Sequence, residues 1–389
     1  MRLIVLDQFS EPGGAQQVLL DLLPEFQARG WEALVGMPGN SAMFDRVREL
    51  GFATGRVACG PFKSGRKSLR DAARFLWQMP RLARQIRRML ASWGADLLYV
   101  NGPRLLPAVP FGVPVVFHAH SYIGPGTARE LVARALVRTR ASVIANCEFV
   151  ASPWRRWVPA AQISVVYNGV AGCGCSSAAR VSPARPTIGC IGRIAPEKGQ
   201  QEFVAAAHLI HRARPDACFQ IVGAPLFGET GATRYERAVR VAAAGLPIKF
   251  TGWVSDVRAM LAEMDLLLVP SAAREATTRV ILESYAAGVP VIAFRSGGMP
   301  EVIEEGVTGH LAGSAEEMAA LAIDLLRGPA RLREMSQSAR ECWQCRFTLQ
   351  RYRREVLSWL GRAAAGRTKP PPLPPEVRRL PESRCIPRE

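Results

Sequence analysis

The sequence has no long apolar run and is short of acidic residues. No stretch approaches the ~18 uninterrupted apolar residues of a membrane-spanning helix. The opening residues, MRLIVLDQFS, lack the longer apolar segment and the cleavage site of a secretory signal. We therefore expect the mature chain to start at Met1 and to be cytoplasmic.

Acidic residues number 33 against 50 Lys and Arg, which gives a net charge of +17. Residues 1–170 hold 21 basic against 11 acidic residues, residues 171–360 hold 22 against 19, and residues 361–389 hold 7 against 3. The excess of basic residues in the first half and the tail favours anionic partners, such as phosphate-bearing ligands, lipid headgroups or nucleic acid. No signature of a nucleic-acid-binding fold occurs, so nucleic acid is not expected among them.

Cysteine is scattered and odd in number, with nine residues in all. This favours reduced thiols over a disulfide framework. The pairs CGC (173–175) and CWQC (342–345) are half of a metal site at most, because no Cys/His pair at ligand spacing accompanies either of them. Asp and Glu pairs also lack such spacing, and we predict no metal site.

Short apolar runs alternate with longer amphipathic segments in two series, one before and one after a polar, Pro-containing stretch. This rhythm is typical of βαβ units that build parallel sheets. With 48% hydrophobic and 21% charged residues, the chain is long enough for two globular domains. We predict two doubly wound domains facing across a cleft. The predicted boundaries are an N-terminal domain at 1–170, a linker at 171–186, a second domain at 187–340, a C-terminal helix at 341–360, and a disordered basic Pro-rich tail at 361–389.

The segment IGCIGRIAPEKGQQEFVAAAHLI (188–210) places two cations between a strand and a helix. The strand ends in Gly192, the loop carries Arg193 and Lys198, and the helix begins near Gln200. Free backbone N–H groups and cations at the mouth of a sheet form a phosphate site. This is not the loop of ATPases, because GxxxxGK[ST] is absent from the chain. By itself the segment fits a phosphate site and a solvated loop equally well.

Paired glycines occur after an apolar run in each half of the chain. In SGGMPEVIEEGVTGHL (296–311), Gly298 follows a strand pattern, and the N–H groups of Met299 and Glu301 can cap a helix or a phosphate. In SEPGGAQQVLLDLL (10–23), Gly13 and Gly14 open a helical pattern. Each pair alone predicts only a turn.

The segment REATTRVILESYAAGVPVIA (274–293) holds two glutamates. Glu275 stands at a loop end after an apolar run, and Glu283 follows eight residues later within a predicted helix. A carboxylate at either position is ordinarily a helix-start residue or part of a solvated helix face.

In combination, these motifs resemble the retaining glycosyltransferases of family 4, which have the two-domain GT-B fold. The resemblance runs from about Arg2 to Leu360 and is strongest from Thr187 to Leu311. It implies that Arg193 and Lys198 hold the diphosphate of a donor, that Glu275 contacts the donor sugar beside its anomeric carbon, and that Glu283 holds the ribose hydroxyls. A carboxylate within a helix can accept two hydrogen bonds from a vicinal diol, which agrees with this assignment. The resemblance further implies that Gly13, Gly14, Gly298 and Met299 belong to the donor site.

The segment between the two glutamates departs from the family pattern. The family usually has a Glu-Pro-Phe-Gly-like string, whereas this chain has EATTRV. Thr278 is expected to cap the following helix, and its side chain fills space that glycine leaves open. The identity of the donor is thereby left open.

The run PVVFHAHS (114–121) holds two histidines on one face of a predicted strand. A core histidine is the usual interpretation of such a residue. The resemblance implies that a histidine of the first domain lines the cleft near the transferred sugar, and His118 matches that position better than His120.

A basic amphipathic stretch, residues 63–93, contains nine Lys and Arg, one acidic residue and two tryptophans. It fits an anionic membrane surface and an ordinary solvated helix equally well.

We therefore expect a retaining glycosyltransferase that moves a sugar from a nucleoside diphosphate sugar, of UDP or GDP type, to a hydroxyl of a glycan or lipid-linked acceptor. No cofactor is expected, and polysaccharide or glycolipid synthesis is the expected context, with peripheral attachment to the inner face of the membrane. The alternatives are a nucleotide-sugar epimerase of the same architecture and a non-catalytic protein that binds anionic ligands or membranes.

Overall fold

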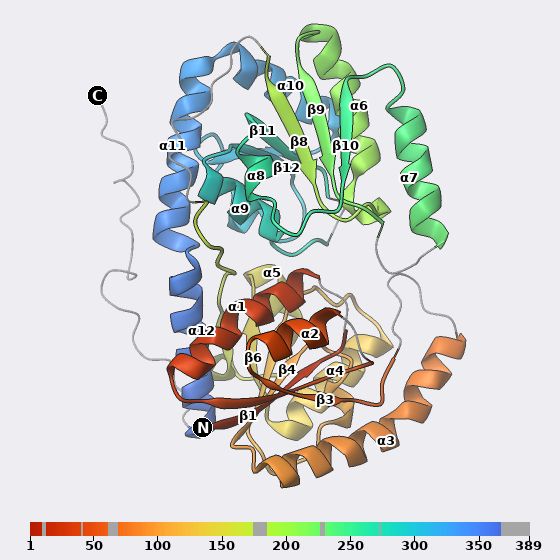
Figure 1. The fold of residues 1–389 in the computed structure, drawn as a ribbon, viewed down its shortest axis with the longest axis vertical. Coiled ribbons are helices and arrows are strands. Elements are labelled where there is room, and N and C mark those ends of the chain that lie inside the picture. The colour runs from red at the N-terminus through yellow and green to blue at the C-terminus, as the bar shows by residue number, and fades with distance from the viewer. Residues whose placement is uncertain are drawn as a thin grey trace.

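The structure is a computed structural model that describes residues 1–9, 13–39, 42–60, 69–173, 185–225, 230–271 and 274–366. Most of the predicted linker (174–184) and of the predicted tail (367–389) lies outside the described residues, as does the start of the basic stretch (63–68). The chain forms two α/β domains, one above the other in Figure 1.

The first domain is built on a seven-stranded parallel sheet in the order β3-β2-β1-β4-β5-β6-β7. Its central strands are buried along their length because helices cover both faces, which explains their continuous apolar sequences. The strands are β1 (Arg2–Asp7), β2 (Glu32–Met37), β3 (Ala53–Arg56), β4 (Leu97–Asn101), β5 (Val115–Ala119), β6 (Ser142–Ala145) and β7 (Ile163–Val165).

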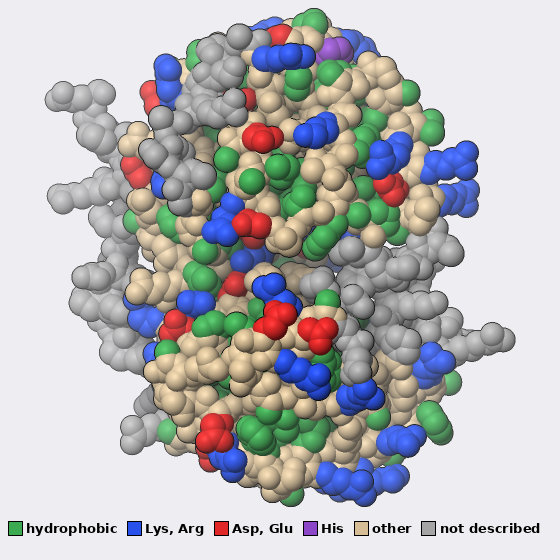
Figure 2. All heavy atoms as spheres, in the orientation of Figure 1, with side chains coloured by type: hydrophobic (Ala, Val, Ile, Leu, Met, Phe, Trp, Pro, Cys, Tyr) green, Lys and Arg blue, Asp and Glu red, His purple; other side chains and the backbone are tan. Residues whose placement is uncertain are grey.

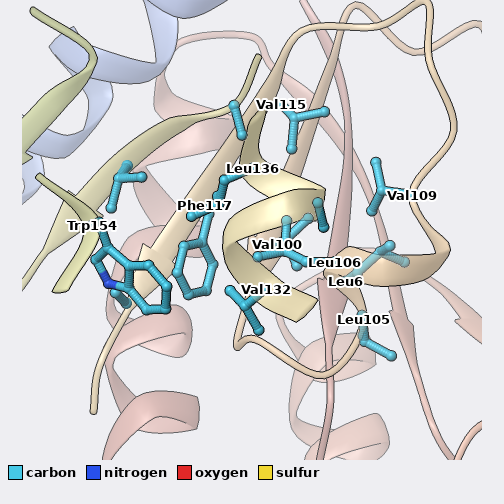
Figure 3. Packing of buried hydrophobic residues seen from close by; sticks show 14 of the residues in the cluster. Leu6, Val100, Leu105, Leu106, Val109, Val115, Phe117, Val132, Leu136 and Trp154 are labelled. Atoms are coloured by element: carbon cyan, nitrogen blue, oxygen red, sulfur yellow. The ribbon is translucent and has the colours of Figure 1, made fainter. Parts of the chain in front are cut away.

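Helices α1 (Gly14–Ala28) and α2 (Ala42–Glu49) cover one face of this sheet, and α3 (Leu69–Trp93) and α4 (Thr127–Thr139) cover the other. On the second face, Phe117 of β5 packs edge-on against Trp154, with ring centroids 5.9 Å apart (Figure 3). The short helix α5 (Glu148–Ala151) follows β6.

The second domain is built on a six-stranded sheet in the order β10-β9-β8-β11-β12-β13, again with parallel pairs. Its strands are β8 (Thr187–Ile191), β9 (Cys218–Val222), β10 (Ile248–Gly252), β11 (Leu266–Val269), β12 (Val291–Phe294) and β13 (Gly309–Ala312). Its helices are α6 (Gln200–Ala213), α7 (Thr230–Ala242), α8 (Arg258–Leu261), α9 (Arg279–Ala287), α10 (Ala315–Arg327) and α11 (Pro329–Arg346). The two sheets confirm the predicted pair of doubly wound domains.

The last helix, α12 (Leu349–Ala364), leaves the second domain and packs on the first. Tyr352, Val356 and Leu357 are buried there in the same core cluster as α1. The chain thus crosses between the domains twice, and the two crossings are joined where Val170 N donates to Phe347 O at 3.0 Å and Leu349 N donates to Val170 O at 3.0 Å.

The order of the strands reverses between β1 and β4 in the first sheet and between β8 and β11 in the second. Ligands of such sheets lie beyond the carboxyl ends of the strands at these points. Residues that end or follow strands of both sheets line one shared cavity, so the carboxyl ends of the two sheets face each other. None of the described helices is long and apolar enough to cross a membrane.

Candidate active site

A cavity of about 480 Å³ lies between the two domains. On the first domain it is lined by residues that end or follow strands, namely Gln8, Asn101, His120 and Asn146; on the second domain by Gly192, Gly223, Trp253 and Glu275. Basic and acidic side chains gather where the two domains meet on the face drawn in Figure 2. The site therefore needs both domains.

The loop after β8 brings two cations to this cavity. Arg193 and Lys198 both line it, with side chains 18% and 21% exposed. Arg193 contacts the Glu197 carboxylate, and Lys198 Nζ donates to Glu275 Oε2 at 2.7 Å. At Gly199 φ is +70°, and a Cβ atom would lie 1.9 Å from the carbonyl oxygen of Pro270, so the turn that aims Lys198 at the cavity accepts only glycine.

The loop after β11 presents Glu275. Its side chain lines the cavity, and the Lys198 contact ties this loop to the one after β8. Its carbonyl oxygen accepts a hydrogen bond from Gly298 N at 3.1 Å. Glu275, predicted to contact the donor sugar, and Lys198, predicted to hold the diphosphate bonded to that sugar, are thus neighbours in the structure.

Thr278 occupies the N-cap position of α9, but its side chain makes no capping hydrogen bond. The expected side-chain cap is therefore absent. The neighbouring Thr277 is 4% exposed, and its hydroxyl has no partner among the described residues.

Glu283, one turn into α9, also lines the cavity, but it is not alone there. Arg279 Nε donates to Glu283 Oε1 at 2.8 Å, and Arg279 Nη1 donates to Asp21 Oδ2 of α1 at 2.7 Å. Burial raises the pKa of Glu283, while the Arg279 charge acts to lower it. Sequence reasoning missed Arg279 and Asp21; the only signal was that Arg279 lies four residues before Glu283 on one helix face.

The predicted glycine-loop residues separate into two groups. Gly13 and Gly14 line the cavity at the first turn of α1, where helix N–H groups have no intrahelical acceptor. Gly298 and Met299 are not among the described residues that line it. Their N–H groups donate to Glu275 O and Ser296 O, so they support the Glu275 loop and do not reach a ligand in this arrangement.

The assignment of His118 to the cavity wall is corrected by the structure, which places His120 there. His118 is fully buried in β5, where its Nδ1 contacts Tyr99 OH and its Nε2 has no partner among the described residues. Burial and the neighbouring His120 lower the pKa of His118 well below its ordinary value. The two rings lie 4.0 Å apart on one face, with His120 nearer the end of the strand.

A hydrogen-bond chain fixes the proton on His120. Asp7 accepts from Asn101 Nδ2 at 2.5 Å and from Gln16 Nε2 at 2.8 Å, so Asn101 Oδ1 faces His120 Nε2 at 2.6 Å. An amide oxygen only accepts, which puts the hydrogen on Nε2 and leaves Nδ1 as an acceptor. Burial lowers the pKa of His120 to about 3 and raises that of Asp7 to about 6. His120 is therefore a neutral hydrogen-bond acceptor at neutral pH.

Among the described residues, no three His, Cys, Asp or Glu side chains gather as metal ligands would. Positive charge in the cavity comes from Arg193, Lys198 and Arg279. The arrangement thus supplies cations for a diphosphate, carboxylates for hydroxyl groups and a neutral imidazole on the opposite wall.

Comparison with known proteins agrees with this geometry. Residues 12–171 match the family model described as Glycosyltransferase Family 4, and residues 185–328 match the one described as Glycosyl transferases group 1. The chain is 34% identical over 166 residues to a GDP-mannose-dependent monoacylated alpha-(1-6)-phosphatidylinositol monomannoside mannosyltransferase of Corynebacterium glutamicum, over 40% of this chain and 42% of that protein. It is 32% identical over 176 residues to a GDP-mannose-dependent alpha-(1-6)-phosphatidylinositol monomannoside mannosyltransferase of Mycolicibacterium smegmatis, over 42% of this chain and 45% of that protein. The matches span less than half the length of these curated relatives.

Solved structures share the fold over nearly the whole chain. Anabaena Alr3699/HepE, in complex with UDP and glucose, matches with a TM-score of 0.77 at 24% identity, over 93% of this chain and 99% of that one. Sucrose-phosphate synthase from Thermosynechococcus elongatus matches with a TM-score of 0.76 at 19% identity, over 94% of this chain and 99% of that one. The fold is therefore GT-B, and the chain, with both halves matched in order by glycosyltransferase models, belongs to the family 4 glycosyltransferases.

Proposed function

We propose that the protein transfers a sugar from a nucleoside diphosphate sugar to a hydroxyl group of a glycan or lipid-linked acceptor, with retention of the anomeric configuration. The observation that carries the proposal is the convergence of Arg193, Lys198, Glu275 and Glu283 on one cavity beyond the carboxyl ends of both sheets. These residues come from three separate elements of the second domain, and a merely solvated loop would not bring them together.

The chemistry follows from the charges that face the cavity. As the bond to the sugar breaks, negative charge develops on the departing diphosphate, and Arg193 and Lys198 stabilise it in a partly desolvated site. In the proposed retaining course, the acceptor hydroxyl approaches on the face from which the diphosphate leaves, and the diphosphate takes up its proton. Glu275, beside Lys198, then faces the sugar, and Glu283 accepts hydrogen bonds from the ribose.

The donor we propose is of UDP or GDP type. The curated relatives named above use GDP-mannose on phosphatidylinositol mannosides, which supports a GDP sugar and a lipid-linked acceptor. The structural neighbour with bound UDP supports the alternative base.

Incubation with a panel of radiolabelled UDP and GDP sugars, with and without a membrane lipid extract, tests the proposal. Transfer, or slow release of the nucleoside diphosphate by hydrolysis, is the expected result. A changed sugar on an intact nucleotide would instead identify an epimerase, and the absence of turnover with any donor would leave a binding protein. Proton NMR of the anomeric centre of the product tests retention.

We further propose that the first domain attaches reversibly to an anionic membrane through α3. On this helix Leu76 and Trp77 are 63% and 74% exposed, and Arg74 and Arg81 are exposed beside them. Helix α3 lies at the edge of the first domain, away from the second (Figure 1). Apolar side chains ringed by cations suit an anionic bilayer, to which each basic residue contributes about 1 kcal/mol at low salt.

Sedimentation with anionic liposomes tests the attachment. Changing Arg81, Arg84, Arg87 and Arg88 to Glu should abolish co-sedimentation at low salt without affecting donor binding. The matched control changes four exposed arginines of the second domain to Glu, namely Arg212, Arg234, Arg237 and Arg333. Wild-type protein that stays in the supernatant at low salt would rule the attachment out.

A further inference from the structure

We propose that Arg279 and Asp21 form a positioning pair across the cleft that holds the Glu283 carboxylate for the donor ribose. This inference rests on the proposed function, because it concerns the same donor site. It adds two residues, one from each domain, to which the sequence analysis assigned no role.

The geometry of the pair is that of one guanidinium between two carboxylates. Arg279 begins α9, and it reaches Glu283 Oε1 at 2.8 Å with Nε and Asp21 Oδ2 at 2.7 Å with Nη1. The three side chains are only 14–21% exposed. A planar guanidinium that donates in two directions holds both partners in fixed orientations.

Asp21 is itself held in place by the first domain. Gln17 Nε2 donates to its Oδ1 at 3.1 Å, and Arg353 Nε of α12 donates to its carbonyl oxygen at 2.6 Å. The position of Arg279 is thus set from the opposite side of the cleft.

The contact with Arg279 leaves one carboxylate oxygen of Glu283 to face the cavity. Oε1 is occupied by Arg279, whereas Oε2 has no hydrogen-bond partner among the described residues, and the side chain lines the cavity. A carboxylate clamped at one oxygen presents the other in a single orientation, which suits a hydroxyl group of a vicinal diol. Burial raises the pKa of this carboxyl group, and the nearby Arg279 charge acts against that effect, in favour of the ionised form that accepts at both oxygens.

The pair also links ribose recognition to closure of the cleft. The 2.7 Å contact between α9 and α1 is lost when the domains move apart by about 1 Å, because the two atoms are then too far apart for a hydrogen bond. Glu283 is therefore fully oriented only while the cleft is closed, so the ribose binds best in that state.

Calorimetric titration with two probes tests the inference. The probes are the nucleoside diphosphate, UDP or GDP, that binds the wild type more tightly and its 2′,3′-dideoxy analogue. The Kd of the dideoxy analogue divided by the Kd of the parent nucleotide measures recognition of the ribose hydroxyls. In Asp21→Asn and in Arg279→Met this ratio should fall about tenfold, the equivalent of one charge-assisted hydrogen bond. In Arg279→Lys, whose side chain reaches one carboxylate at a time, the ratio should lie between those of the wild type and Arg279→Met.

Two controls separate positioning from a general loss of structure. Asp45→Asn removes an exposed carboxylate from α2 of the same domain and should leave the ratio unchanged. The double variant Asp21→Asn/Arg279→Met should be no worse than Arg279→Met alone, because Asp21 acts through Arg279.

The outcomes distinguish this inference from the proposed function. If the wild type discriminates the probes and Glu283→Ala does not, but Asp21→Asn keeps the wild-type ratio, the positioning pair is wrong and the donor site stands. If the wild type binds neither UDP nor GDP, both the proposed function and the inference are overturned.

Discussion

The two glutamates of the cavity have different partners, and this separates their expected roles. Glu275 is paired with Lys198 at the loop after β8, whereas Glu283 is paired with Arg279 and lies one turn into α9. Glu283→Ala should weaken donor binding, because the proposed ribose contacts would be present in both the ground state and the transition state. Glu275→Ala should act mainly on kcat, because its proposed contact is to a centre whose charge changes during reaction. Steady-state kinetics with the active donor will measure both; donor affinity that survives Glu283→Ala unchanged argues against the ribose assignment.

The neutral state of His120 predicts a pH dependence of stability. The pKa of His120 in the folded protein, about 3, lies below the ordinary value of 6.5. Its contribution to the free energy of unfolding is therefore full above pH 6.5 and is lost as the pH falls toward 3. From pH 7.5 to 5.5, the wild type should lose about 1.4 kcal/mol more unfolding free energy than His120→Gln. Asp7, with its raised pKa of about 6, contributes most below pH 3.8 and loses that contribution as the pH rises through 6, but it does so equally in both proteins. Chemical denaturation at the two pH values measures the difference, and equal losses in both proteins would mean that His120 titrates normally.

At the residue scale, motif spacing could predict several of the groups whose side chains or helix ends reach the cavity. Arg193, Lys198, Glu275, Glu283 and the two glycines at the start of α1 all lie there. It could not choose between His118 and His120, because alternation along a strand puts both on one face and only the end of β5 decides which meets the cavity. It also could not foresee that the N–H groups of Gly298 and Met299 are used within their own loop.

The loops after β11 and β12 form one packed unit, and a glycine fixes their contact. Gly297 has φ of +53°, and a Cβ atom there would lie 1.7 Å from Glu275 O. Gly297→Ala should therefore displace the Glu275 loop, lowering stability by more than ~1 kcal/mol and reducing kcat.

Gly306→Ala is the matched control for Gly297→Ala. It has a similar positive φ of +76°, but nothing lies within 4 Å of the added Cβ atom. It carries the backbone strain without the collision, so it should cost less stability and leave kcat unchanged. Equal effects of the two substitutions on thermal unfolding and turnover would show that the loop contact is unimportant.

At the element scale, apolar runs predicted the buried strands but missed one edge strand of each sheet, β3 in the first and β13 in the second. The apolar runs LIVLD (3–7) and DLLYV (96–100) predict strands and correspond to β1 and β4, which are buried on both faces. The edge strand β3 has the half-exposed sequence ATGR, which carries no apolar signal, and β13 is only the four residues GHLA. Neither edge strand stood out as an apolar run.

The two domains are joined by a second contact, away from the Arg279 pair, that involves Glu301. Its carboxylate accepts from Glu148 N and Phe149 N of the first domain, each at 2.7 Å, and from Tyr167 OH at 2.9 Å. The loss of charge-assisted hydrogen bonds at a helix start costs about 1–3 kcal/mol. Glu301→Gln should therefore lower the midpoint of thermal unfolding by several degrees, roughly 2–4 °C per kcal/mol. Glu304→Gln, an exposed neighbour, serves as the control; equal midpoints in both variants would exclude Glu301 as a domain contact.

At the scale of the whole molecule, the two-domain arrangement was predictable because each series of apolar runs is a self-contained sheet. The contacts between the domains were not, since Asp21 and Arg279 are 258 residues apart and no local pattern relates them. The passage of α12 back onto the first domain likewise depends on tertiary packing of its buried face.

The account depends above all on the cavity between the domains being a nucleoside diphosphate site. Calorimetric titration of UDP and GDP into the wild type, Arg193→Ala, Lys198→Ala and the exposed-surface control Arg333→Ala tests this directly. We predict that one nucleotide binds the wild type at one site per chain, that each cavity variant loses about 1.5–3 kcal/mol of binding free energy, and that Arg333→Ala loses none. Failure of both nucleotides to bind the wild type, or equal binding by the wild type and both cavity variants, would contradict the account.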